Sequence, residues 1–153
     1  MRSVRTVIAI NAPARVVWSI LTDVAAYPAW NPFIRNFQGT VAEGARLRVS
    51  IAPEGAAPMT FRPTVIRCIP DQELTWLGRV LLPGLFDGEH RFRLEPDGAG
   101  VRFVHEETFR GLLVPLLWPR IANPTRAGFE AMNRALKQRA EAMALDMNRD
   151  TAA

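Results

Sequence analysis

The chain is poor in cysteine and lysine, and it lacks long apolar runs. Cys68 is the only cysteine among 153 residues, which excludes an internal disulfide bond and a zinc site built from cysteine pairs. Lys137 is the only lysine, and the arginines are spread out rather than clustered as in a nucleic-acid-binding arm. No apolar run is long enough to cross a bilayer, and residues 1–17 lack the pattern of a secretory signal. We therefore expect a cytoplasmic protein that binds no nucleic acid and does not insert stably into a membrane.

Composition and length indicate a globular protein with one core. Hydrophobic residues make up 48% of the chain and charged residues 22%, which are ordinary values for a folded domain and disfavour disorder. A chain of 153 residues is large enough for one domain and too short for two. We expect a single domain over residues 1–147, followed by a short tail at residues 148–153.

The first third of the chain predicts one strand and two short helical segments. Residues 3–10 alternate between apolar and polar side chains, as in a strand with one buried face. Residues 11–23 combine an N-cap, an early proline and apolar residues at helical spacing. Two prolines four positions apart limit residues 25–33 to a compact helical elbow, which carries Trp30 and Phe33 inward.

Six further strands are expected after the elbow, separated by turns rich in glycine, proline and aspartate. Because short turns join antiparallel neighbours, the seven strands should form one curved antiparallel sheet. Pro63 interrupts one of these strands and predicts a bulge or a sheet edge there, since proline cannot donate to the ladder. The predicted strands cover residues 34–41, 46–52, 59–69, 73–80, 86–96 and 101–110.

A long C-terminal helix is predicted over residues 124–145, with Asn123 as its cap. At 1.5 Å per residue it would be about 33 Å long, which is comparable to the width of seven strands. The helix can therefore lie across the concave face of the sheet. Its apolar stripe consists of Phe129, Met132, Leu136, Ala140, Met143 and Met147.

This order of elements, the motif YPAWNPF at residues 27–33 and the segment GEHRFRLEPDGAGVRFVHEETFRGLLVPLL at residues 88–117 together resemble the START-like superfamily. Bacterial proteins described as polyketide cyclase/dehydrase-like, or SRPBCC, are the most similar in appearance. The resemblance implies an α+β helix-grip fold, in which a seven-stranded curved antiparallel sheet wraps around a long C-terminal helix, with two short helices between strands 1 and 2. Its members bind sterols, lipids, plant hormones or aromatic polyketides, and a minority catalyse cyclisation or dehydration. The resemblance therefore implies a cavity but no single chemistry.

The last two predicted strands place ionisable side chains on the face toward that cavity. If residues 97–100 close the hairpin, His90 faces Glu107 and Phe92 faces His105. Alternate positions on both strands are largely apolar, so this face should be the concave one. An ionised carboxylate alone in an apolar cavity is costly, and Glu107 should pair with a histidine or be partly protonated.

Several roles are open for this cluster. His90 and Glu107 form a structural pair that fixes strand register, or they contact a ligand. In a catalytic version they act, with His105, as general acid and base on an enolisable carbonyl compound. Two histidines and a glutamate could also bind a metal ion, but simple hydrogen bonding among them is the favoured role. We therefore expect no metal and no other cofactor.

The predicted binding site combines residues of the elbow, the sheet and the long helix. Gly78 and Gly88 lie at inward positions, where missing side chains leave room for a ligand. The expected occupant is a small hydrophobic molecule. The predicted ligand-binding residues are Trp30, Phe33, Trp76, Gly78, Phe86, His90, Phe92, Phe103, His105, Glu107, Phe109, Phe129, Met132 and Leu136.

Two apolar stretches, residues 80–86 and 112–118, fall where loops are expected. We expect them to form the mouth of the cavity and a movable lid; a dimer interface or a membrane contact is the alternative, and the chain is a monomer or a homodimer. The function favoured is binding or transport of a lipid-like or aromatic molecule. The alternatives are a polyketide cyclase/dehydratase-type enzyme and a cochaperone-like domain whose apolar lips contact another protein.

Overall fold

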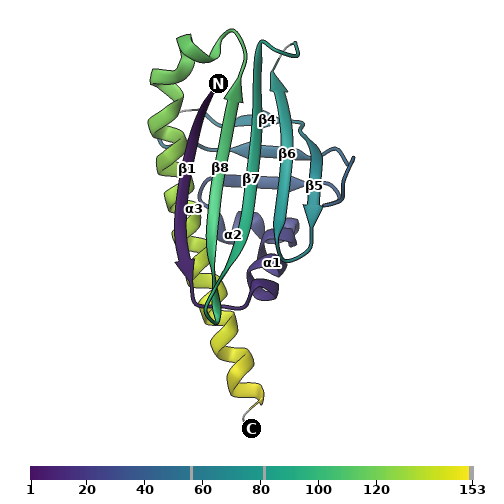
Figure 1. Ribbon diagram of the computed structural model, residues 1–153, viewed down its shortest axis with the longest axis vertical. Coiled ribbons are helices and arrows are strands. Elements are labelled where there is room, and N and C mark those ends of the chain that lie inside the picture. The colour runs from purple at the N-terminus through teal and green to yellow at the C-terminus, as the bar shows by residue number, and fades with distance from the viewer. Residues whose placement is uncertain (56, 81, 152–153) are drawn as a thin grey trace.

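The computed structural model describes residues 1–55, 57–80 and 82–151 (Figure 1). Strands and helices follow one another in an α+β order. The elements are β1 (Arg2–Ile10), α1 (Ala14–Thr22), η1 (Val24–Ala26), α2 (Tyr27–Trp30), β2 (Ile34–Gln38), β3 (Arg48–Ile51), β4 (Met59–Phe61), β5 (Thr64–Ile69), β6 (Glu73–Val80), β7 (Phe86–Asp97), β8 (Gly100–Arg110) and α3 (Val114–Thr151).

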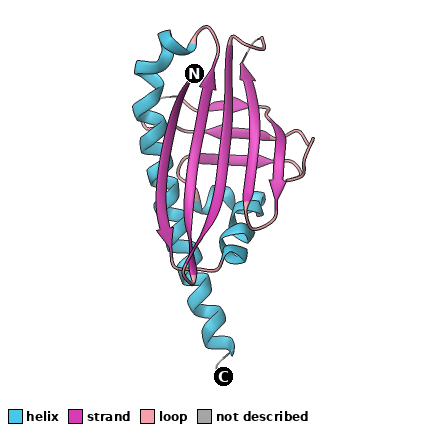
Figure 2. Ribbon diagram, in the orientation of Figure 1, coloured by secondary structure: helices cyan, strands magenta, loops and turns pink. Residues whose placement is uncertain are grey.

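The strands form two antiparallel sheets. The larger sheet has five strands in the order β1-β8-β7-β6-β5, and the smaller has three in the order β2-β3-β4. The strands of the smaller sheet run across those of the larger one (Figure 2). The prediction of an α+β fold with a long C-terminal helix packed on a curved antiparallel sheet is confirmed, whereas the prediction of one seven-stranded sheet is wrong.

Pro63 accounts for the division into two sheets. The predicted strand at residues 59–69 is interrupted there and gives the separate strands β4 and β5, because proline has no N–H to donate. The carbonyl of Pro63 still accepts a hydrogen bond of 2.8 Å from the N–H of Leu47. A single bridge joins Arg46 to Thr64 at the same corner. The predicted edge is confirmed, since β5 is an edge strand of the larger sheet.

Helix α3 is longer than its predicted 124–145 range, because it begins at Val114 and ends at Thr151. Pro119 and Pro124 lie inside it, where each removes one helical hydrogen bond. Packing of the first turns offsets this cost, since Val114 is buried and Trp118 packs against the core. Residues 114–118, expected to be a loop, are therefore helical, and so are the described residues of the expected tail at 148–153.

The middle of α3 packs against the larger sheet, chiefly along β1. Four residues of the predicted apolar stripe are fully buried: Phe129, Met132, Leu136 and Ala140. Met143 and Met147 are 38% and 42% exposed, so the buried stripe ends at Ala140. Beyond that point the helix extends past the end of the sheet (Figure 1). None of the described helices combines the length and hydropathy needed to span a membrane.

Candidate functional site

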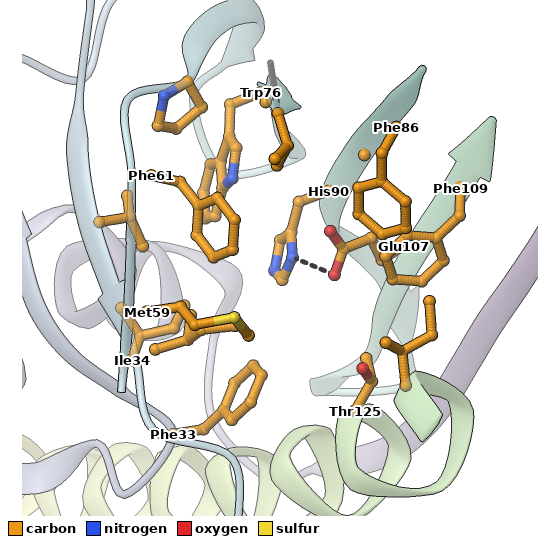
Figure 3. A pocket seen from close by; sticks show the side chains of 17 residues that line it. Phe33, Ile34, Met59, Phe61, Trp76, Phe86, His90, Glu107, Phe109 and Thr125 are labelled. Carbon is orange, nitrogen blue, oxygen red and sulfur yellow. Dashed lines mark hydrogen bonds and ion pairs between the residues drawn. The ribbon is translucent and has the colours of Figure 1, made fainter. Parts of the chain in front are cut away.

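A pocket of about 100 Å³ lies between the two sheets and the first half of α3 (Figure 3). Its lining is mainly apolar and includes five phenylalanine or tryptophan side chains. His90 and Glu107 are the ionisable side chains among the described lining residues. The lining consists of Phe33, Ile34, Val49, Ile51, Met59, Phe61, Pro63, Trp76, Gly78, Val80, Phe86, Gly88, His90, Glu107, Phe109, Ile121 and Thr125.

Half of the predicted site residues line this pocket. These are Phe33, Trp76, Gly78, Phe86, His90, Glu107 and Phe109, and their role in ligand binding stays a prediction. Trp30 is half-buried and packs against Tyr27, with ring centroids 5.1 Å apart. The others are buried in the core beside the pocket: Phe92, Phe103, His105, Phe129, Met132 and Leu136.

The pocket lies nearer the start of α3 than the sequence predicts. The sequence places Phe129, Met132 and Leu136 in the ligand site, but these three side chains are fully buried in the core. The helix contributes Ile121 and Thr125 instead, and Ile121 belongs to a part of α3 that was expected to precede the helix. The bulky stripe of α3 fills the space over the middle of the larger sheet, and the pocket lies beside it, between the two sheets.

Several lining residues were missed because they belong to the smaller sheet. Strand β4 and the proline that follows it contribute Met59, Phe61 and Pro63 to the lining. The sequence pattern predicts that this segment belongs to one continuous sheet. Val49 and Ile51, on β3, also line the pocket and lie outside the predicted site. The proline in the predicted strand was the available signal for this segment. A proline indicates that strand pairing is interrupted, but it does not indicate which strand the neighbouring segment pairs with.

The predicted register of the last hairpin is confirmed. His90 pairs with Glu107, Phe92 with His105, and Pro96 with Val101 across β7 and β8. Nδ1 of His90 lies 3.4 Å from Oε2 of Glu107 (Figure 3). The His90 side chain is 6% exposed and the Glu107 side chain 21%. The expectation that Glu107 pairs with a histidine is therefore confirmed.

Gly88 makes room for the Glu107 carboxylate. A β-carbon at Gly88 would lie 2.7 Å from Oε1 of Glu107, which is closer than real β-carbons approach other atoms. At Gly78, by contrast, a β-carbon would make ordinary van der Waals contacts of 3.8 Å or more, and the glycine lines the pocket. The two inward glycines thus have different roles, one in positioning the acid and one in shaping the cavity.

His90 is held between aromatic rings and a second histidine. Its imidazole stacks on Trp76 with ring centroids 4.5 Å apart and planes inclined by 4°. Its Nε2 lies 3.0 Å from Nε2 of His105. Because each nitrogen of His90 has a partner and the ring is clamped by the indole, its orientation toward Glu107 is fixed.

Two buried polar residues extend this cluster into the core. Nδ1 of His105 lies 2.9 Å from Oδ1 of Asn133 on α3, and Nδ2 of Asn133 donates to Oγ1 of Thr6 on β1 at 2.9 Å. Burial lowers the pKa of His105 well below its usual value, and the neighbouring His90 lowers it further. Neither Asn133 nor Thr6 was predicted. Each is a polar residue inside an apolar pattern, which is the signal that could have identified them.

No group of three or more His, Cys, Asp and Glu side chains is arranged to hold a metal ion in the described ranges. His90, His105 and Glu107 form a line rather than a ring around one point. The Nε2 atoms of the two histidines face each other, and Glu107 lies at the opposite nitrogen of His90. The arrangement is therefore suited to sharing and passing protons.

The two apolar stretches lie side by side at one end of the molecule. The N–H groups of Leu112 and Leu113 donate to the carbonyls of Gly84 and Leu85 at 3.1 and 3.0 Å. Exposed leucines occur in both stretches: Leu82 is 70% exposed, Leu112 83% and Leu116 74%. Val80 and Phe86, at the ends of the first stretch, line the pocket, and residue 81 lies outside the described residues. The movement of these stretches as a lid stays a prediction.

Comparison with known proteins gives a family match over most of the chain. Residues 1–141 match the family described as polyketide cyclase / dehydrase and lipid transport. A search of curated proteins finds no match.

Solved structures share the fold at low sequence identity. TTHA0849 from Thermus thermophilus has a TM-score of 0.74 and 18% identity, over 94% of this chain and 99% of that one. A START superfamily protein from Mycobacterium smegmatis has a TM-score of 0.73 and 22% identity, over 92% and 98%. The di-domain ARO/CYC protein StfQ, from the steffimycin biosynthetic pathway, has a TM-score of 0.75 and 14% identity; the match covers 93% of this chain and 52% of StfQ.

Proposed function

The chain belongs to the family described as polyketide cyclase / dehydrase and lipid transport, and from this premise we propose that it binds a small, largely apolar molecule in the pocket between its two sheets and α3. The polar group of that molecule lies at Glu107. The observation that carries the proposal is the pocket itself, whose apolar walls converge on a single paired carboxylate. Apolar pockets with few polar groups are typical of small-molecule sites.

The size and lining of the pocket favour a single aromatic ring or a chain of similar bulk. Its volume is about 100 Å³, which is below the roughly 150 Å³ of an apolar cavity that holds benzene in another protein. One ring is therefore the upper limit, and it fits only when a side chain at the mouth moves aside. Met59, which is 45% exposed on the three-residue strand β4, is the side chain most easily displaced. We therefore place the entrance at β4.

A second candidate function, proton-transfer catalysis on a bound carbonyl compound, is favoured by the His90–Glu107 contact. A carboxylate and an imidazole 3.4 Å apart in a pocket can share a proton and deliver it to a ligand. The folds shared with StfQ and the START superfamily protein are compatible with either function, because this fold carries several chemistries.

The binding proposal is tested by NMR titration with p-cresol and toluene, which have the same ring and differ by one hydroxyl. We expect both to shift the resonances of Trp76 and Phe109 in the pocket, and p-cresol to bind more tightly through Glu107. Gly78→Leu should abolish both titrations by placing a bulky side chain in the pocket. Leu145→Ala, at a side chain that is 60% exposed near the C-terminal end of α3, is the matched control and should leave them unchanged.

Absence of any shift in pocket resonances would contradict the binding proposal, as would equal titrations of the wild type and Gly78→Leu. Native mass spectrometry of the purified protein adds a second readout, since a co-purifying apolar molecule should be lost in Gly78→Leu. The catalytic alternative predicts that Glu107→Gln retains p-cresol binding but loses turnover. Unchanged turnover of a carbonyl substrate in both Glu107→Gln and His90→Ala would exclude it.

A further inference from the structure

We infer that a buried hydrogen-bond chain from Thr6 through Asn133 and His105 fixes the tautomers of both histidines, so that His90 and Glu107 share one proton and present a hydrogen-bond acceptor to the pocket. Thr6, Asn133 and His105 are then positioning residues for Glu107. The assignment of the proton rests on geometry, burial and charge, and on no assumption about the ligand. Its consequence for the ligand rests on the function proposed above.

The direction of the chain is set at its buried end. The hydroxyl of Thr6 donates to the backbone carbonyl of His105 at 3.5 Å, and a carbonyl can only accept. The hydroxyl has one hydrogen, so its oxygen is left to accept from Nδ2 of Asn133 at 2.9 Å. This orients the amide with Oδ1 toward Nδ1 of His105, 2.9 Å away. Oδ1 also can only accept, and Nδ1 of His105 must therefore carry a hydrogen.

The tautomer of His105 then determines that of His90. His105 is fully buried and its lowered pKa keeps it neutral, so the ring with a hydrogen on Nδ1 has a bare Nε2. Nε2 of His90, 3.0 Å away, must donate to it. The remaining nitrogen of His90, Nδ1, faces Oε2 of Glu107 at 3.4 Å. One proton lies between these two atoms, because two bare acceptors would repel each other and two protons would clash.

Charge gives a second, independent argument for this direction. Reversing the hydrogen bonds between Thr6 and Glu107 would also give each side chain a partner, with Oδ1 of Asn133 accepting from Thr6 and both histidines neutral, although the His105 carbonyl would lose the Thr6 hydroxyl. It would leave Glu107 ionised beside a neutral His90, however, and none of the described lining residues is a cation that could neutralise it. In the direction inferred here, the His90–Glu107 pair has no net charge wherever the shared proton resides. A partly buried pair without net charge is less costly than a lone carboxylate.

The shared proton has a consequence for ligand choice. Whether it resides on Nδ1 of His90 or on Oε2 of Glu107, the second carboxyl oxygen, Oε1, carries no hydrogen and can only accept. Oε1 lies over Gly88, which lines the pocket. The pocket should therefore prefer an uncharged ligand with a hydroxyl group over the corresponding aldehyde or carboxylate. Asn133 and Thr6 take part in this preference although neither lines the pocket.

The test of the tautomers needs no ligand. The chain contains two histidines, so two-bond ¹H–¹⁵N correlation spectra of the uniformly labelled protein show two imidazoles, which His90→Gln assigns. We expect His105 with a hydrogen on Nδ1 and a bare Nε2, and His90 with a hydrogen on Nε2. A His105 ring protonated on Nε2 would overturn the inference, whatever the protein binds.

Variants of Thr6 test the positioning role. Thr6→Val removes the hydroxyl at nearly constant size, so the charge of Glu107 is the one restraint left on the Asn133 amide, and the second tautomer of His105 should become detectable. Thr6→Ser keeps the hydroxyl and should restore the single tautomer, which a merely structural role would not predict. A single unchanged tautomer in Thr6→Val would overturn the role of Thr6.

The ligand preference is measured separately with benzyl alcohol, benzaldehyde and benzoate, which have the same carbon skeleton. We expect benzyl alcohol to bind at least about fivefold more tightly than benzaldehyde, the difference that one net hydrogen bond gives, and benzoate to bind most weakly. Thr6→Val should reduce the ratio, and Thr6→Ser should preserve it. Equal affinities for the three, with the expected tautomers present, would overturn the preference while leaving the proton assignment intact. Failure of all three and of p-cresol to bind would instead count against the proposed function.

Discussion

The imidazole of His105 lies flat against the phenyl ring of Phe129, with ring centroids 3.6 Å apart and planes inclined by 14°. Both side chains are fully buried, so this contact joins β8 to α3 inside the core. A neutral imidazole packs well against an apolar ring, whereas a protonated one would place a charge where water cannot reach it. The stability of the fold is thereby linked to the protonation of one histidine.

Stability should fall as the pH drops below about 6.5, the ordinary pKa of histidine in an unfolded chain. The pKa of His105 is lower than this in the folded protein. Below pH 6.5 the unfolded chain therefore binds a proton that the folded chain does not, which favours unfolding by up to about 1.4 kcal/mol per pH unit. Urea unfolding at about pH 7 and about pH 5.5 measures the effect.

The matched control for this experiment is His105→Gln, which cannot take up the proton and should have a smaller pH dependence in the same range. If the free energy of unfolding had the same pH dependence in the wild type and in His105→Gln, the loss of stability could not be attributed to His105. Glu95 and Glu141 also have lowered pKa values, from hydrogen bonds with Arg102 and Lys137. Their effect on stability appears near and below the ordinary glutamate pKa of about 4.3 in the unfolded chain, which lies outside the window used.

Gly88→Ala should displace the carboxylate of Glu107, because the new β-carbon would lie 2.7 Å from Oε1. The end of a glutamate side chain can rotate, so we expect the fold to persist at a cost of about 1 kcal/mol or less. The contact with His90 should be lost, which the ¹⁵N shifts of its imidazole report. Gly78→Ala on the neighbouring strand is the control, since its β-carbon fits with contacts of 3.8 Å or more. Identical His90 shifts in both variants would refute the role assigned to Gly88.

Gly128→Ala should destabilise the protein although it lies inside a helix. At a free helical position the change would stabilise by about 1 kcal/mol. Here the new β-carbon would overlap the ring of Phe33, and overpacking of this kind costs about 1 to 3 kcal/mol. Urea unfolding of Gly128→Ala in the wild type and in Phe33→Ala forms a double-mutant cycle. The cost should disappear when the ring is absent; a cost that remains would point to a cause other than Phe33.

Tyr27, the only tyrosine of the chain, should not ionise while the protein is folded. Its side chain is fully buried, its hydroxyl donates to the carbonyl of Leu21 at 2.8 Å, and burial raises its pKa. The unfolded chain loses this proton above about pH 10, so stability should fall as the pH rises past that value. An alkaline titration followed by tyrosinate absorbance and by circular dichroism should give coincident transitions. Tyrosinate that forms before the helical signal is lost would contradict the prediction.

The register of the last hairpin was predictable to the residue because it depends on residues that are close together in the sequence. The turn at residues 97–100 fixes which positions face each other, and the two-residue period of the strands fixes which side chains share a face. His90 and Glu107 could therefore be paired from the sequence. The α+β class and the apolar stripe from Phe129 to Ala140 follow from equally local periodicities.

The tertiary structure decided the rest, because it depends on segments that are distant in the sequence. Pro63 predicts a break in pairing, but only packing places β4 in a second sheet and so creates the wall with Met59 and Phe61. Asn123 and Pro124 predict that α3 starts at residue 124, yet burial of the first turns outweighs the hydrogen bonds lost at Pro119 and Pro124. The contact of His105 with Asn133 joins residues 28 positions apart, and that of Asn133 with Thr6 joins residues 127 positions apart. Local patterns determined the chemistry available to this protein, and long-range packing determined where the cavity opens and which polar atoms meet at its wall.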